Sequence, residues 1–241
     1  MKTIDAVWEK RNLGVETVEF IVDYNDDESV LAEILNAEKQ YNVVKLPVNK
    51  SELMALLQDN GYRFVECMLS IQHDLSEAKI AATKRLRMFN LDYSLMDEPD
   101  IDDLFQEMKK GMFSTDRIYN DPRFPKEAAA ERYKNWINDE REKGAAIYKL
   151  LFRCSAVGFF IIKKLDGGIS NPFLVGLYDG YQDKGFGLSL AKNILCECLK
   201  QGARKVIGSV SSNNPAIIRL DEMLGYEIRD IEYVFVKHRT G

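Results

Sequence analysis

Residues 181–195 read YQDKGFGLSLAKNIL, a glycine-rich turn followed at once by a strongly helical run. Such a turn exposes consecutive backbone N–H groups at the start of a helix, because glycine adopts dihedral angles that are closed to other residues. The helix dipole and these N–H groups favour an anion, above all a phosphate or a pyrophosphate. The stretch therefore indicates either a site for a phosphate-bearing ligand or a plain strand-to-helix turn.

Two common nucleotide motifs do not fit this turn. A Rossmann fingerprint needs a third glycine, and this chain has Leu190 at that position. A Walker A loop needs the order Gly-Lys-Ser/Thr, whereas the order here is Lys184-Gly185-Phe186. What remains is the pattern Gln-x-x-Gly-x-Gly between a predicted strand and a predicted helix.

The composition narrows the class of protein. With 46% hydrophobic and 29% charged residues, the 241-residue chain is typical of a globular protein. A net charge of −5 argues against nucleic acid as the main partner, since phosphate backbones need concentrated Lys and Arg. Four scattered cysteines and two distant histidines lack the spacing of metal ligands, so we expect no metal. Without a signal peptide or a long apolar run, we expect a cytoplasmic protein with no membrane partner.

Strand and helix patterns alternate along the first third of the chain, which predicts a small α/β domain over residues 1–80. The charged segment 74–88 marks the expected boundary. Residues 85–241 then predict the order β-α-α-β-β-β-α-β-α-β, ending in one long strand or a hairpin. The fold class is α+β, with a mixed sheet rather than a doubly wound one.

Two segments of the chain echo each other. Residues 49–66 read NKSELMALLQDNGYRFVE, and residues 214–230 read NPAIIRLDEMLGYEIRD. Both run from an Asn through an apolar-faced helix to Gly-Tyr and then to a strand. The echo has two interpretations, ordinary helix capping or a true half-repeat of one fold.

The glycine turn, the preceding VGLYDG and the following NNPAIIRLDEMLGY together resemble the GCN5-related N-acetyltransferase family over residues 88–241. The resemblance implies a central mixed sheet that splays at its centre, flanked by helices and preceded here by the small α/β domain. It also implies acetyl-CoA as co-substrate, held along the strand 173–179 and by the turn. The cofactor-binding residues that it implies are Leu177, Gln182, Asp183, Lys184, Gly185, Phe186, Gly187, Leu188 and Asn214.

One position departs from the family pattern. Aligned from Asn214 to Gly225-Tyr226, the chain has Asp221 where the family has the tyrosine that protonates the departing thiolate. An aspartate is mostly ionised at neutral pH unless it is buried. Three interpretations follow: the pKa of Asp221 is raised, another group such as Tyr178 or a water donates, or turnover is absent.

The substrate side is predicted from residues 113–124, FSTDRIYNDPRF, and from WEKRNLGVETVEF near the start. These resemble the N-acetyltransferases that acylate dTDP-4-amino-4,6-dideoxygalactose (dTDP-fucosamine), which also place a small α/β domain first. Arginines would meet a diphosphate and aromatic rings would meet a sugar or a base; the alternative is a structural loop between two helices. The candidate substrate-binding residues are Phe113, Arg117, Tyr119, Asp121 and Arg123.

The sequence thus predicts an N-acetyltransferase that acts on a primary amine, with a nucleotide-linked amino sugar as the favoured small-molecule acceptor. The candidate catalytic residues are Asp221 and Tyr178, and Asp179 or Asp121 are guesses for the base. A peptide, polyamine or other amine is the alternative acceptor, and a catalytically silent acyl-CoA-binding module is the alternative class. A homodimer is compatible with all of these.

Overall fold

The computed structural model describes residues 1–83, 86 and 88–239. Within these residues ten strands form one mixed sheet, in the order β1-β2-β3-β10-β4-β9-β8-β7-β6-β5. The strands are β1 (Lys2–Asp5), β2 (Thr17–Ile21), β3 (Tyr41–Pro47), β4 (Arg63–Asp74), β5 (Asp92–Leu95), β6 (Ala146–Phe152), β7 (Ser155–Leu165), β8 (Ile169–Leu177), β9 (Lys205–Ser211) and β10 (Glu227–His238). The helices are α1 (Val7–Leu13), α2 (Val30–Asn36), α3 (Ser51–Asp59), α4 (Glu77–Ala82), α5 (Glu98–Met108), α6 (Arg117–Asn120), α7 (Glu127–Glu142), α8 (Phe186–Lys200) and α9 (Pro215–Leu224).

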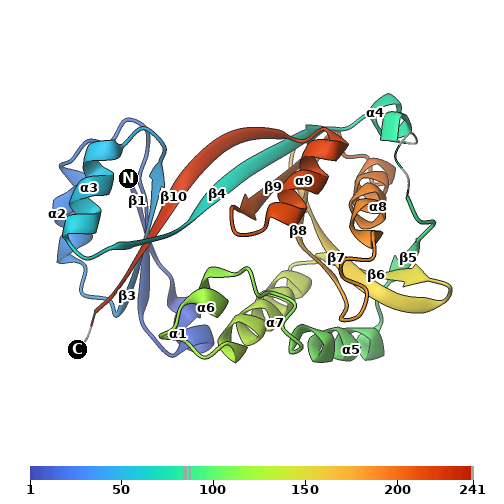
Figure 1. Cartoon of the computed structure of the whole chain (residues 1–241), viewed down its shortest axis with the longest axis horizontal. Coiled ribbons are helices and arrows are strands. Elements are labelled where there is room, and N and C mark those ends of the chain that lie inside the picture. Colours follow the sequence, from blue (N-terminus) through green and yellow to red (C-terminus); the bar gives the residue numbers. More distant parts are fainter. Residues whose placement is uncertain (84–85, 87, 240–241) are drawn as a thin grey trace.

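Helices cover both faces of the sheet. In β7, Phe160 and Ile162 pack into the core below α8, whereas Phe159 and Ile161 pack against α5 and α7 on the opposite face. Successive side chains of a strand point to opposite faces, so a strand covered on both sides reads as a continuous apolar run. Figure 1 shows the pairs α2/α3 and α8/α9 at the two ends of the molecule, with α5, α6 and α7 below the sheet.

The sheet joins two halves by exchanging one long strand from each. The last strand, β10, inserts between β3 and β4, and β4 lies between β10 and β9. In one half, Met68 of β4 pairs with Ser211 of β9. In the other half, Glu232 of β10 pairs with Pro47 of β3. Met68 and Glu232 are 164 residues apart, and so are Pro47 and Ser211. Met68 and Glu232 also pair with each other. The two halves are therefore related by an approximate twofold axis through this pair.

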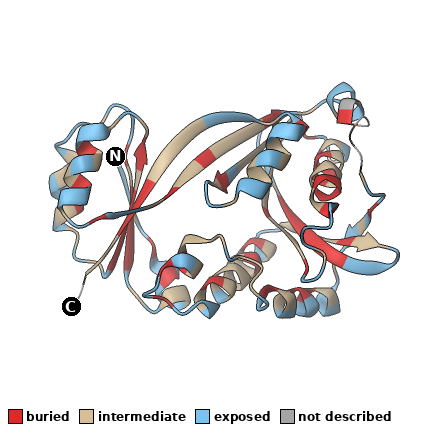
Figure 2. Ribbon diagram, viewed as in Figure 1, coloured by how far each residue is buried: buried red, intermediate tan, exposed pale blue. Residues whose placement is uncertain are grey.

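The exchange crosses the predicted domain division. Residues 1–80 and 85–241 contribute strands to one sheet, although residue 85 itself lies outside the described residues. Buried residues gather under the helices at both ends, while the β4/β10 ribbon between them is mostly half-buried (Figure 2). The division into domains at residues 1–80 and 85–241 stays a prediction. That both parts share one sheet was not predicted.

The predicted element order of residues 85–241 is confirmed, with one addition. The closing segment is a single strand, β10, and the expected loop at 113–124 contains the short helix α6. Asp116 begins α6, because its side chain accepts a hydrogen bond from the Ile118 N–H at 2.7 Å. Helix α1 and strand β1 were also missed, since both are too short to show a clear periodicity.

Candidate active site

Strands β8 and β9 separate shortly after they begin. They pair in parallel at Ile169–Lys205 and Ser170–Val206, and no later pair between them occurs in the described part of the chain. On its other edge β8 stays paired with β7 as far as Leu177, with one extra residue, Phe173, inserted opposite Ile161 and Ile162. This bulge bends β8 away from β9. A wedge therefore opens beside residues 173–177, and the backbone edge that β8 turns toward it has no strand partner.

The glycine turn lies directly after this strand. Gly185 precedes α8 with a φ of 83°, and Asp183 has a φ of 58°, so the chain turns through left-handed conformations before the helix. Among the residues that the structure describes, no side chain caps the first turn of α8. Its N–H groups are therefore available to an anion.

The side chains of the predicted turn residues divide into two groups. Gln182, Asp183 and Lys184 are exposed. Phe186 and Leu188 are buried in the core below α8, so their side chains are not available to a ligand, and only their backbone groups could contact one. A Cβ on Gly187 would lie 2.9 Å from Leu220 Cδ1, which explains why the residue is glycine where α8 and α9 meet.

Asn214 begins α9, because its side chain accepts a hydrogen bond from the Ile217 N–H at 3.3 Å. Two turns later lies Asp221. Burial raises the pKa of Asp221 to about 7, and its Oδ2 atom is buried without a hydrogen-bond partner among the described residues. At neutral pH a large fraction of this carboxyl group therefore carries its proton, as the first of the three interpretations requires.

Tyr178 lies away from Asp221. Its ring packs into the core between the sheet and α5, together with Leu104 and Ile147. Burial, and next the carboxylate of Glu107, raise the pKa of the Tyr178 hydroxyl above its ordinary value. The two candidate acids thus belong to opposite faces of the sheet, and only Asp221 comes from the face that carries α8 and α9.

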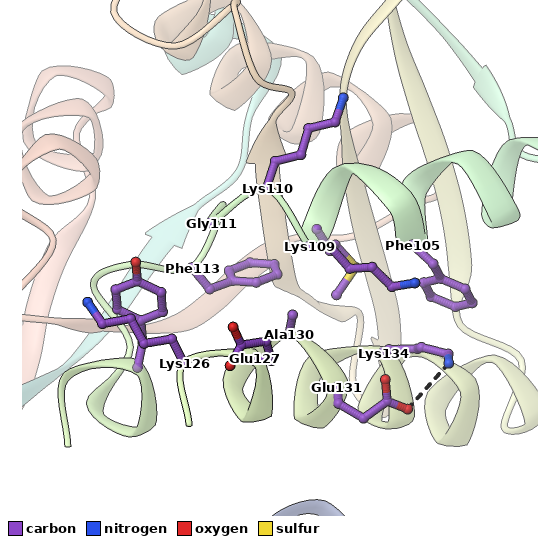
Figure 3. Close-up of a pocket in the computed structure, with 12 residues that line it drawn as sticks. Phe105, Lys109, Lys110, Gly111, Phe113, Lys126, Glu127, Ala130, Glu131 and Lys134 are labelled. Carbon is purple, nitrogen blue, oxygen red and sulfur yellow. Dashed lines mark hydrogen bonds and ion pairs between the residues drawn. The ribbon is translucent and has the colours of Figure 1, made fainter. Parts of the chain in front are cut away.

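The predicted substrate residues are only partly brought together. Phe113 and Tyr119 line a pocket of about 560 Å³ between α5 and α7 (Figure 3). Arg117 is instead buried and pairs with Glu19 of β2 at 3.3 Å. Asp121 is buried and lies 2.7 Å from His238 Nε2. Arg123 is exposed, and its backbone N–H donates a hydrogen bond to the Asp121 side chain.

Sequence reasoning missed the lysines of this pocket, Lys109, Lys110, Lys126 and Lys134. One signal was present. Lys126, Ala130 and Lys134 follow each other at intervals of four residues, which places them on one face of a helix. What the sequence did not show is that Lys109 and Lys110, at the end of α5, meet the same face.

Among the described residues, no group of three or more His, Cys, Asp or Glu side chains lies in an arrangement that would hold a metal ion. In the same residues no helix is both long and apolar enough to cross a membrane.

The chain has partial likeness to one characterised sequence. No protein-family profile matches it. A segment of 81 residues is 32% identical to the mycothiol acetyltransferase of Corynebacterium efficiens and covers 34% of this chain. The matched segment spans only 27% of that relative's length, so the relative's activity does not pass directly to this chain.

Solved structures share the architecture at low sequence identity. A conserved protein of unknown function from Staphylococcus epidermidis superposes with a TM-score of 0.60 at 15% identity, covering 93% of this chain and 84% of that one. A tandem GCN5-related N-acetyltransferase from the clavulanic acid biosynthesis pathway gives 0.58 at 11%, covering 93% and 76%. A GCN5-related N-acetyltransferase from Sphaerobacter thermophilus gives 0.57 at 14%, covering 83% and 61%.

These likenesses agree with the geometry of the chain itself. The split parallel pair β8/β9 and the glycine turn before α8 occur in the order that the sequence resemblance implied, and the bulge in β8 was not predicted. The chain has the fold of the GCN5-related N-acetyltransferases.

Proposed function

We propose that this chain transfers the acetyl group of acetyl-CoA to a primary amine. The observation that carries the proposal is the wedge between β8 and β9, together with the glycine turn and the helix start of α8 that follow β8 in the chain. An extended strand edge beside a phosphate-binding helix start suits a ligand with a long amide-containing arm and a pyrophosphate. The residues proposed to hold acetyl-CoA are Leu177, Gln182, Asp183, Lys184, Gly185, Phe186, Gly187, Leu188 and Asn214.

The chemistry that we propose is direct attack by the neutral amine on the thioester. Backbone N–H groups on the free edge of residues 173–177 would stabilise the negative charge that develops on the carbonyl oxygen. Asp221 would donate the proton that the departing thiolate takes up, because its raised pKa keeps a protonated carboxyl available near neutral pH. Tyr178 is the alternative donor, and its burial beneath α5 makes it the weaker candidate.

The favoured acceptor is a nucleotide-linked amino sugar. The resemblance of residues 113–124 to nucleotide-sugar N-acetyltransferases supports it, and the contribution of Phe113 and Tyr119 to the pocket agrees with a substrate role for this segment. We do not carry Arg117 and Asp121 into the proposed substrate site, because each is buried with a partner, Glu19 and His238 respectively.

A thiol-release assay tests the proposal. The full chain would be mixed with acetyl-CoA and a panel of aminosugar nucleotides, polyamines and peptides. We expect release of coenzyme A thiol with at least one amine, and the largest rate with an aminosugar nucleotide. Activity on peptides alone would replace the acceptor, and binding of acetyl-CoA without thiol release on any amine would favour the silent module.

A further inference from the structure

We propose that the pocket between α5 and α7 binds a nucleoside diphosphate, the anionic end of the acceptor, through its lysines. The identity of the acceptor rests on the proposed function, whereas the expectation that an anion binds here rests on the residues that line the pocket. Its lining carries four lysines, Lys109, Lys110, Lys126 and Lys134, against two glutamates, Glu127 and Glu131. This positive surface lies on a chain whose net charge is −5.

Two of these lysines are not paired with a carboxylate. Lys134 pairs with Glu131 at 3.3 Å, and Lys110 pairs with Glu107 at 2.7 Å. Lys109 reaches only the amide oxygen of Gln106 at 3.4 Å, whereas Lys126 lies 4.4 Å from the centre of the Tyr119 ring. In the described part of the chain, neither Lys109 nor Lys126 forms an ion pair. Both ammonium groups are therefore available to a phosphate.

The pocket also offers aromatic surface beside these cations. Phe113, Tyr119 and Phe105 contribute to its lining, and Figure 3 shows Phe113 between the Lys126 end and the Lys109 end. The Phe113 ring packs on Tyr133, with ring centres 4.0 Å apart. A pocket that combines aromatic rings with ammonium groups suits a ligand in which a planar base is joined to phosphates.

The wall of the pocket is held in place by buried polar contacts. Tyr133 donates a hydrogen bond from its hydroxyl to Asp116 at 2.8 Å, and Asp116 also begins α6. Arg117, the next residue, is fixed by Glu19 of β2. The segment that carries Phe113 and Tyr119 is therefore preorganised, which lowers the entropic cost of binding a ligand.

The pocket adjoins the strand that forms the wedge. Gly111 and Phe113 line the pocket, and Met112 between them packs on Gly176 of β8, where a Cβ would lie only 2.6 Å from Met112 Sδ. Met112 thus lies over the face of β8 that packs against α5 and α7. The lysine pocket therefore adjoins the same strand whose other edge parts from β9.

Calorimetric titration tests the inference on the full chain, with thymidine diphosphate as the probe and coenzyme A already present at saturation. Coenzyme A occupies the proposed cofactor loop, so that binding of the probe reports a separate site. We expect binding that weakens with added salt, and a dissociation constant about tenfold higher in the double variant Lys109→Glu/Lys126→Glu. Lys164→Glu, an exposed lysine on β7, is the control and should leave the constant within about twofold.

Three results would overturn the inference: no binding at millimolar probe, binding that saturating coenzyme A abolishes, or an unchanged constant in a double variant whose melting temperature shows that it is folded. None of these affects the thiol-release assay with simple amines, which tests the proposed function. Conversely, a chain that binds thymidine diphosphate but not acetyl-CoA would retain the pocket and lose the acetyltransferase.

Discussion

The two halves of the sheet are built on one plan but differ at the place where a ligand would enter. In the first half, β2 and β3 pair in parallel over five residues, and the Val22 N–H continues the ladder to the Lys45 carbonyl at 2.9 Å. In the second half, the equivalent strands β8 and β9 pair over two residues and then part. The parallel pair is thus continuous in the first half and separates in the second, so that a wedge forms only between β8 and β9.

The turn that follows β8 and the turn that follows β2 differ in chemistry as well. Before α8 the chain has Gly180, Gly185 and an uncapped helix start. Before α2 it reads DYNDDES over residues 23–29, which concentrates carboxylates where the other half presents bare N–H groups. These carboxylates would repel a pyrophosphate. We therefore infer that the first half serves as a support for the second and does not hold a second acyl-CoA.

One pair of equivalent residues summarises the difference. With the offset of 164 residues, Leu57 of α3 is equivalent to Asp221 of α9. By the same offset, Gly61-Tyr62 is equivalent to Gly225-Tyr226. Leu57 is fully buried among apolar side chains. Asp221 has a buried carboxyl oxygen that no described residue contacts by a hydrogen bond. A position that only packs in one half carries a titratable group in the other.

Removal of the first half should have the largest effect. Without residues 1–80, β9 loses its neighbour β4, and β10 loses both β3 and β4. Exposed strand edges promote association with other chains. We expect residues 85–241 alone to aggregate or to lack a cooperative thermal transition, as measured by circular dichroism. A soluble, cooperatively folding fragment that binds acetyl-CoA would show that the halves are independent.

Gly185→Val should have the second largest effect, a weaker binding of acetyl-CoA. A β-branched residue at a φ of 83° is strained, and its side chain would crowd Phe89. We expect affinity for acetyl-CoA to fall about 100-fold, roughly 3 kcal/mol. Gly14→Val, at a φ of 73° after α1 with no atom near its Cβ, is the matched control in the other half. If both variants lost the same affinity for acetyl-CoA, the loss would come from a destabilised fold and not from the turn before α8.

Asp221→Asn should reduce turnover and leave acetyl-CoA affinity unchanged. The amide keeps the shape but cannot donate a proton to a thiolate, so we expect kcat to fall about 10- to 100-fold. The wild-type rate should decline as pH rises through about 7, where the Asp221 carboxyl ionises, and this decline should be missing from the variant. A wild-type profile that is flat from pH 6 to pH 8 would exclude Asp221 as the acid.

Asp221→Leu, which copies Leu57, should produce the smallest change, a gain in stability. The pKa of Asp221 is raised from 3.8 to about 7 on folding, so the folded protein binds a proton that the unfolded chain has lost. Wild-type stability therefore falls as pH rises from about 4 to 7 and then levels off. We expect the variant to exceed the wild type by roughly 1–3 kcal/mol at pH 8 and by less at pH 5. Urea unfolding at both pH values measures this, and equal gaps would exclude the raised pKa.

Much of this fold could be predicted because its signals are local. Gly185 and Gly225 mark helix ends by their left-handed conformations, and the Asn214 cap shows which helix follows β9. The echo of the two Gly-Tyr segments allowed either a half-repeat or ordinary helix capping, and the exchanged strands β4 and β10 favour the half-repeat. Lys50, not Asn49, stands at the N-cap of α3.

The rest depends on contacts between distant segments. The exchange of β4 and β10 pairs Met68 with Glu232, 164 positions later, and no local pattern records such a pairing. Arg117 was predicted to meet a diphosphate because residues 113–124 resemble nucleotide-sugar N-acetyltransferases and because a guanidinium group suits phosphates. Its partner Glu19 lies almost a hundred positions away in the other half, which only the fold brings near.

The central claim is that one wedge, between β8 and β9, holds the acyl donor. Hydrogen exchange of backbone amides, measured with and without acetyl-CoA, tests it most directly. We predict protection over residues 173–188 and no change over residues 17–30. Protection at 17–30, or no protection in either half, would contradict the account.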